Sequence, residues 1–326
     1  MKKLLSMFMI LTLSISMLSG CGTENEVDAS SESGIADTVS VEYTELENEA
    51  VALASAPAAK LEYAVEASGT KEARAAKGVI DYSHTEDGYV MVSYLKKTDK
   101  KIKAQVKGPK TTYTYNVAPE EWETFPLSDG NGTYQINLLE NVSGSKYAMV
   151  VSTSFEVKLT DEFAPFLRSN QYVNYEAAPN TVKKAASLTK KAKTELKKVE
   201  KIYNYVVKNY KYDKKKAQTV QTGYVPDLDK VLKSKKGICF DYAATMAGML
   251  RSQGVPCKLV IGYAGETYHA WISVYVEGQG WVDGVVYFDG DTWQRMDPTF
   301  ASTGNQSKAI MKYIGNGKNY SAKYFY

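Results

Sequence analysis

Apolar and polar residues alternate along several stretches of the first half of the chain, and a period of two predicts half-buried β-strands. The alternation is clearest at 101–107, Lys-Ile-Lys-Ala-Gln-Val-Lys. Similar short runs occupy 89–94, 112–117, 133–138 and 147–155. Turn sequences such as Asp-Gly-Asn-Gly at 129–132 separate them. This spacing predicts an all-β, sandwich-like domain over residues 71–160.

The period changes in residues 161–326. Apolar residues recur at steps of three and four from Leu196 to Tyr210, which predicts a helix with a lysine-rich solvent face. Residues 239–253 are rich in Ala, Met and Leu, and Gly254 and Pro256 follow, so a second helix is expected there. Strand-like runs come next, at 258–263, 269–276, 280–282, 285–288 and 294–299. Helices followed by antiparallel strands indicate an α+β domain, so the predicted fold class is α+β, with an all-β N-terminal domain followed by this α+β domain.

The first twenty residues have the layout of a secretory signal peptide. Lys2 and Lys3 precede an apolar stretch at 4–18, which is too short for a stable transmembrane helix. The sequence Leu-Ser-Gly-Cys at 18–21 resembles a bacterial lipobox. The resemblance implies cleavage before Cys21 and lipidation of its thiol, hence a lipoprotein anchored on the extracellular face of the cell membrane. The alternative is an ordinary signal peptide with a chance cysteine.

The segment after Cys21 is acidic. Residues 22–59 contain nine Asp or Glu and no Lys or Arg, which predicts a disordered, lipid-anchored tether over 21–70. The whole chain carries +3, but without this segment and the two leader lysines 38 basic and 28 acidic residues remain, about +10. A basic ectodomain would be attracted to an anionic cell wall, or the lysines form only a solvated surface. Nucleic acid is not an expected partner of a secreted chain.

Three residues are placed for nucleophilic catalysis. Cys239 follows Gly237-Ile238 and begins a predicted helix, whose N-terminal N–H groups and dipole favour a thiolate over a thiol. His269 begins a strand, and its imidazole could accept the thiol proton and return it to a leaving amine. Asp297 lies at the end of a later strand and could hold the imidazole in the right tautomer.

The other cysteine, Cys257, lies in an apolar strand-like run and is interpreted as a small core residue. Pairing with Cys239 in an oxidising compartment is the alternative. The sequence has only two histidines and no paired Cys-x-x-Cys spacing, so neither a metal nor another cofactor is expected. A metal site made by Cys239, His269 and Asp297 is a further alternative.

These motifs, in this order, resemble the bacterial transglutaminase-like superfamily over about residues 177–302. The matching segments are Gly-Ile-Cys-Phe-Asp-Tyr-Ala at 237–243, the run at 250–256, Gly-Tyr at 262–263, His-Ala-Trp at 269–271, Gly-Trp-Val at 280–282 and Met-Asp-Pro-Thr at 296–299. The resemblance implies a papain-like core with a Cys239–His269–Asp297 triad that transfers acyl groups through a thioester. It also implies an oxyanion hole formed by the Cys239 N–H and a second donor, for which Tyr224 is a candidate. Trp271 and Trp281 would either wall the site or pack in the core.

Three functions remain open. The first is a surface thiol hydrolase acting on peptide or amide bonds of proteins or cell-wall peptides. The second is a protein-crosslinking transglutaminase, which differs only in whether an amine or water resolves the thioester. The third is a non-catalytic binding lipoprotein, in which the β domain recognises the partner.

Overall fold

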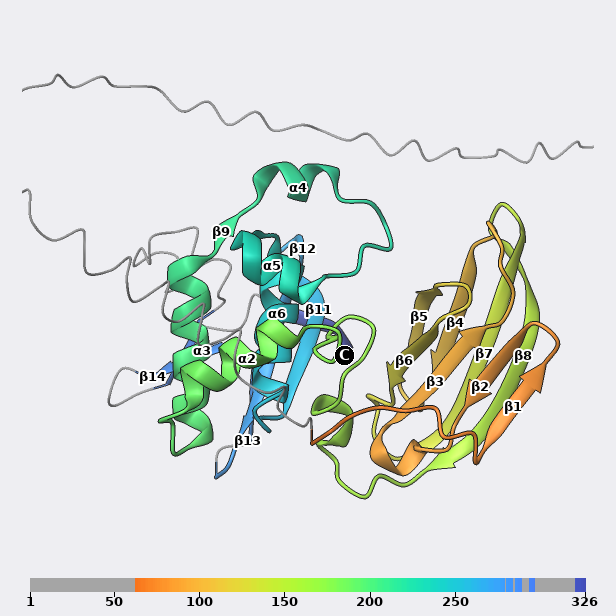
Figure 1. Ribbon diagram of the computed structural model, residues 1–326, viewed down its shortest axis with the longest axis horizontal. Helices are drawn as coiled ribbons and strands as arrows, with labels where there is room; N and C mark the ends of the chain where they lie inside the picture. The colour runs from red at the N-terminus through yellow and green to blue at the C-terminus, as the bar shows by residue number, and fades with distance from the viewer. Residues whose placement is uncertain (1–61, 279, 284, 289–292, 297–319) are drawn as a thin grey trace, which may run out of the picture. The chain divides into compact units, whose positions relative to one another are not determined.

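The structure is a computed structural model that describes residues 62–278, 280–283, 285–288, 293–296 and 320–326 (Figure 1). These residues fall in one compact unit, Glu49–Tyr326. The predicted signal peptide, the lipidation residue Cys21 and most of the predicted tether lie outside the described residues, as does Asp297. Among the described helices, none is long and apolar enough to cross a membrane.

Two four-stranded antiparallel sheets form the β-rich N-terminal part. The first sheet has the order β1-β2-β3-β6 and the second β5-β4-β7-β8. Their bounds are β1 Glu72–Ala75, β2 Gly78–Asp81, β3 Tyr89–Tyr94, β4 Ile102–Lys107, β5 Thr112–Val117, β6 Trp122–Pro126, β7 Gly132–Ser143 and β8 Lys146–Val157. In β4 every second residue is buried, starting from Ile102, as the period of two predicts. The all-β, sandwich-like prediction is confirmed.

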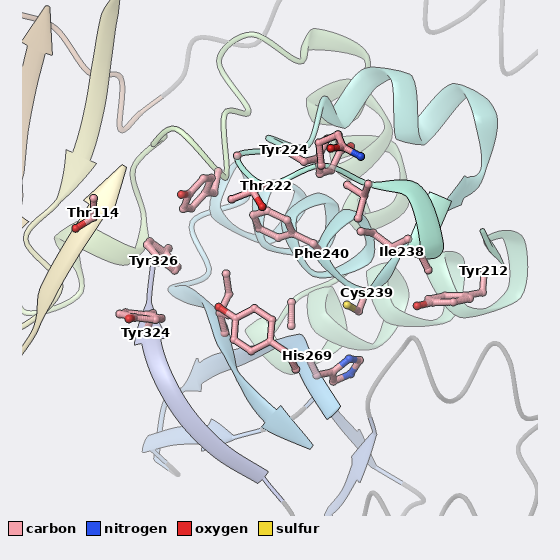
Figure 2. A pocket seen from close by; sticks show the side chains of 18 of the residues that line it. Thr114, Tyr212, Thr222, Tyr224, Ile238, Cys239, Phe240, His269, Tyr324 and Tyr326 are labelled. Atoms are coloured by element: carbon pink, nitrogen blue, oxygen red, sulfur yellow. The ribbon is translucent and has the colours of Figure 1, made fainter. Parts of the chain in front are cut away.

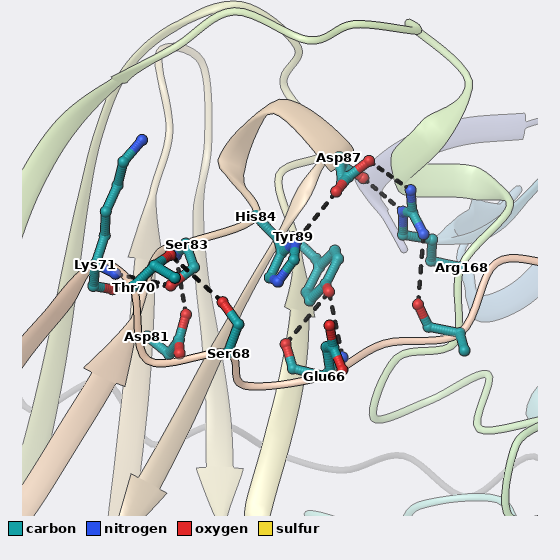
Figure 3. A network of polar contacts seen from close by, with 11 residues as sticks. Glu66, Ser68, Thr70, Lys71, Asp81, Ser83, His84, Asp87, Tyr89 and Arg168 are labelled. Carbon is teal, nitrogen blue, oxygen red and sulfur yellow. Dashed lines mark hydrogen bonds and ion pairs between the residues drawn. The ribbon is translucent and has the colours of Figure 1, made fainter.

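A connector leads from the sandwich into the helical part. It contains the short 3₁₀ helix η2, Ala164–Phe166, and then Arg168. The guanidinium of Arg168 donates to the carbonyl of Asp87 at 2.8 Å and pairs with its carboxylate at 2.7 Å, and it lies over the Tyr89 ring. Figure 3 shows these contacts, with His84 stacked on Tyr89 and bonded to Asp87 through Nδ1. These ion-pair, hydrogen-bond and ring contacts join the connector to the first residue of β3 and to Asp87 just before it.

The C-terminal part is an α+β domain built around one buried helix. Its helices are α2 Pro179–Thr189, α3 Glu195–Asn209, α4 Lys214–Thr219, α5 Leu228–Ser234 and α6 Cys239–Arg251. Eleven of the thirteen residues of α6 are buried, so the other elements cover it on nearly all sides. In α3 the buried face is formed by Val199, Ile202, Tyr203 and Val206, in agreement with the predicted spacing. Thr194 caps the N-terminus of α3 by accepting from Lys197 N.

The main sheet of this domain has the order β13-β12-β11-β16, all antiparallel. Its strands are β11 Cys257–Ala264, β12 Thr267–Val276, β13 Gly280–Asp283 and β16 Tyr320–Phe325. Two small pairs accompany it, parallel β9 Lys211–Tyr212 with β10 Lys236–Gly237, and the hairpin β14 Val285–Phe288 with β15 Trp293–Met296. The last strand that the sequence pattern predicts is 294–299, so β16 was not expected.

Gly262 explains how β16 can approach β11. A Cβ built on this residue would lie 2.1 Å from the Ser321 carbonyl oxygen and 2.9 Å from the ring of Trp271. The pairing also shifts register between Ile261 and Gly262. The missing side chain therefore lets β16 close over the strand, and Trp271 fills the space beneath it.

Candidate active site

A cleft of about 620 Å³ opens at the N-terminal end of α6 (Figure 2). Strand β12, strand β16, the segment 217–224 and two threonines of β5, Thr112 and Thr114, form its walls. Six tyrosines line it, namely Tyr172, Tyr212, Tyr224, Tyr268, Tyr324 and Tyr326. No Asp, Glu, Lys or Arg is among the described lining residues. The cleft therefore offers aromatic faces and hydroxyl groups rather than fixed charges.

Cys239 lies in this cleft as the first residue of α6. Residue 238 before it is extended, with φ −99° and ψ 178°, so the chain turns into the helix at the cysteine. The thiol is free and partly exposed. Because the first N–H groups of a helix lack partners within the helix, they can stabilise negative charge on this sulfur or on an oxygen bound beside it.

His269 lines the same cleft from β12. Only 5% of it is exposed, and its ring lies nearly parallel to that of Trp271, with 6.3 Å between the centroids. Its partner residue across the β11–β12 ladder is Gly262. In the view of Figure 2 the Cys239 sulfur and the imidazole lie at one end of the cleft, whereas Tyr324 and Tyr326 lie at the other. The structure thus brings together two of the three predicted catalytic residues.

Asp297 lies outside the described part of the chain, directly after Met296, the last residue of β15. Strand β14, which pairs with β15, contacts β12, the strand that carries His269. The role of Asp297 stays a prediction.

Tyr224, the candidate oxyanion donor, lines the cleft but has its hydroxyl engaged elsewhere. The hydroxyl donates to Oδ1 of Asp241 at 2.5 Å. Lys216 Nζ lies 2.7 Å from the same hydroxyl and 2.6 Å from Oδ2 of Asp241. Burial and then the bond to Asp241 raise the pKa of Tyr224 well above its ordinary value, so the phenol keeps its proton. In this structure that proton is directed at the carboxylate.

The sequence did not point to two further pairs of residues, one that contacts the cleft residue Tyr224 and one that lines the cleft itself. Asp241 and Lys216 form the contacts just described; Asp241 lies within the matching segment 237–243 but had been given no role, and Lys216 lies outside the matching segments. Tyr324 and Tyr326 reach the cleft from β16 and the residue after it. A signal for the second pair was present in the alternating aromatic residues at 320–326, Tyr-Ser-Ala-Lys-Tyr-Phe-Tyr.

The remaining expectations concern cysteine and tryptophan. Cys257 is free and fully buried in β11, as interpreted from the sequence, and does not pair with Cys239. Burial raises the pKa of its thiol to about 12. Trp271 is buried, and Trp281 packs against Phe166 and Lys258; neither lines the cleft. Within the described part of the chain, no three His, Cys, Asp or Glu side chains are grouped to hold a metal ion.

Cys239 at the start of a buried helix and His269 on the adjoining antiparallel sheet thus line one cleft. Residues 182–283 match the model of the transglutaminase-like superfamily. The chain therefore carries a transglutaminase-like domain, which includes Cys239 and His269.

Similar proteins have been described in animals and bacteria. The human kyphoscoliosis peptidase is 29% identical over 129 residues, which cover 36% of this chain and 17% of the human protein. The mouse protein of the same name is 28% identical over 153 residues, covering 42% and 21%. The chain thus spans about a fifth of the length of these curated relatives. The crystal structure of the periplasmic domain of TgpA from Pseudomonas aeruginosa, bound to ethylmercury, aligns with a TM-score of 0.32 at 16% identity, covering 65% of this chain and 93% of that one.

Proposed function

We propose that this protein is a thiol enzyme that transfers acyl groups through a thioester on Cys239. The observation that carries the proposal is that Cys239, at the N-terminus of α6, shares one cleft with His269. The thiolate would attack the carbonyl carbon of an amide, and the resulting oxyanion would lie by the N–H groups of the first helical turn. His269 would donate a proton to the leaving amine, which departs as the C–N bond breaks. Water or an amine then attacks the thioester and releases Cys239.

Hydrolysis is the outcome that we favour. The cleft opens to solvent, and Tyr268 at its mouth is 59% exposed, so water can reach the thioester. A closed apolar channel that admits amines and excludes water would favour transfer instead. None of the described lining residues forms an acidic patch that would attract a protonated amine. Protein crosslinking is therefore the alternative.

The lining of the cleft favours an uncharged segment of peptide as the acyl donor. Aromatic faces bind apolar and flat groups, and tyrosine and threonine hydroxyls can bond to peptide amides. A charged side chain entering the cleft would lose water without gaining a partner of opposite charge among the described residues. Proteins and cell-wall peptides both offer such neutral amides, so either can be the substrate.

Ammonia and peptide release separate these functions. Glutamine-containing peptides with neutral flanks, and matched peptides with aspartate flanks, would be incubated with the enzyme with and without a primary amine. We expect cleavage or ammonia release without added amine, faster with the neutral flanks and lost in Cys239→Ala. Release that depends on the amine would mean crosslinking. No turnover, with equal peptide binding by the wild type and Cys239→Ala, would mean a binding lipoprotein.

We further propose that the enzyme acts at the outer face of the cell membrane, held by a lipid on Cys21. The support is the leader and the acidic segment after it, which suit a diacyl anchor and a flexible spacer. In cells fed radiolabelled palmitate, the wild type should incorporate label and partition into detergent. Cys21→Ala should lose both properties, and Cys257→Ser, the control, should keep them. Labelling of the Cys21→Ala protein would contradict the anchor.

A further inference from the structure

Beside the cleft, three polar side chains form a cluster around one buried carboxylate. Asp241 is completely buried in the first turn of α6. Its Oδ2 accepts from the Ile238 N–H at 2.8 Å and from Lys216 at 2.6 Å, and its Oδ1 accepts from Tyr224. The carboxylate thus caps the helix that begins with Cys239 and also binds two residues of the neighbouring segment. We call Asp241, Lys216 and Tyr224 the Asp241 brace.

The segment held by the brace has little else to fix it. Helix α4 has no buried residue of its own, and 219–223 are exposed. Yet Ala217 and Val220–Tyr224 form one wall of the cleft. Besides the brace, the Asp213 N–H bonds to the Gly237 carbonyl at the start of the segment, the Asp213 carboxylate lies 3.4 Å from Lys236 Nζ, and the Tyr224 ring meets that of Phe240 edge-on. With no apolar face to bury, the segment depends on polar contacts for its position.

Gly237, two residues before Cys239, makes room for this arrangement. A Cβ on Gly237 would lie 2.6 Å from Asp241 Cβ and 2.8 Å from its Oδ2. Any larger residue would push the carboxylate away from the Ile238 N–H and from Lys216. The glycine that precedes the nucleophile thus serves the brace as well as the turn into α6.

The brace also balances charge beside the nucleophile. Asp241 is two residues from Cys239, and a buried carboxylate without a partner would oppose a second negative charge on the thiol. Lys216, whose side chain is 26% exposed, supplies the compensating charge and lies 4.1 Å over the Tyr224 ring. The other titratable side chains that face Cys239 in the described cleft are His269 and the lining tyrosines.

We propose that Asp241, Lys216 and Tyr224 are positioning residues. They fix the cleft wall 216–224 to the first turn of α6, and Lys216 prevents the Asp241 charge from suppressing the Cys239 thiolate. The positioning role, the first half of the proposal, concerns the fold alone. The charge-balancing role of Lys216, the second half, rests on the proposed thiol chemistry.

Hydrogen exchange tests the first half. In the full chain, Tyr224→Phe and Lys216→Met should each accelerate amide exchange across 216–224 by about tenfold or more, the loss expected for a hydrogen bond to a charged group. Lys215→Met, an exposed neighbour on the same helix, is the matched control and should leave exchange unchanged. Unchanged exchange in both brace variants would overturn the positioning role. Tyr224→Phe removes no charge, so it keeps the test available if Lys216→Met does not fold.

The pH dependence of Cys239 alkylation by iodoacetamide tests the second half. In Lys216→Met the pH of half-maximal labelling should rise by about one unit, because the carboxylate loses its partner. Lys216→Met/Asp241→Asn should return it to near the wild-type value, and Lys215→Met should not move it. A double variant as shifted as the single one would mean a structural effect only and would overturn this half. If the wild type itself labels as an ordinary thiol, the proposed function fails, while the exchange result still decides the positioning role.

Discussion

Cys239→Ala is expected to abolish turnover, and His269→Ala to reduce it by about a thousandfold or more. Without the sulfur no thioester can form, and without the imidazole neither the thiol nor the leaving amine has a proton carrier. Losses of this size are typical when one member of a nucleophile–base pair is removed, because the remaining member cannot act alone. Initial rates of ammonia release from a neutral glutamine peptide would measure both effects.

The same pair can be tested without knowing the substrate. Alkylation of Cys239 against pH would be followed in the wild type, His269→Ala and Asp297→Asn, all lacking Cys21 and carrying Cys257→Ser. We expect rapid labelling well below the reference thiol pKa of about 8.5, lost in His269→Ala and weakened in Asp297→Asn. A labelling profile indifferent to His269 would mean that the two residues do not act together, whatever their shared cleft suggests.

Arg251→Met is expected to destabilise the fold by about 3–5 kcal/mol, a large part of the total for a domain. Arg251 is fully buried near the end of α6. Its guanidinium donates to the Cys257 carbonyl at 2.8 Å, to the Arg168 carbonyl at 2.8 Å and to the main-chain oxygen of Tyr326 at 2.5 Å. It therefore joins the start of β11, the connector and the end of β16. Methionine fills similar space but makes none of these three hydrogen bonds, and only the Tyr326 oxygen is known to keep a second donor, the Leu259 N–H.

Chemical denaturation would measure this loss, and Arg74→Met provides the matched control. Arg74 pairs with Glu72 at the surface, with 54% of its side chain exposed, so its replacement should cost about 1 kcal/mol or less. Burial lowers the pKa of Arg251 only to about 10, so the guanidinium is charged at neutral pH and the effect should be present there. Equal losses of unfolding free energy for the two variants would show that the buried contacts of Arg251 contribute no more than a surface ion pair.

The local pattern of apolar and polar residues was sufficient to predict much of this fold. The alternation in β4 and β5 reflects one face turned to the sandwich interior. The spacing in α3 reflects one stripe packed on the domain. Helix α6 was predicted from residue 239 and ends at Arg251, two residues earlier than expected. At the site, Cys239 starts a helix as predicted, whereas His269, predicted to begin a strand, is the third residue of β12.

What could not be predicted depends on distant pairing and on buried charge. Strand β16 pairs with β11 across about sixty residues, and no local pattern specifies that partner. Arg251 and Asp241 look like solvent-facing residues in the sequence, since charged side chains are seldom fully buried. Lys216 lies in a polar stretch that resembles a surface loop. Their roles follow only from the three-dimensional partners that satisfy them.

The two described thiols differ in a way that bears on oxidative damage. Cys257 is sealed in β11, with its pKa raised by burial, so peroxide or a disulfide reagent has no reactive sulfur to attack there. Cys239 is partly exposed in the cleft, and among the described residues it has no neighbouring cysteine with which to form a protective disulfide. A sulfenic acid formed on Cys239 would depend on an external thiol for rescue, and without one it would proceed to the irreversible sulfinic acid. How long the site survives in an oxidising medium therefore depends on the external thiols available to reduce one sulfur atom, that of Cys239.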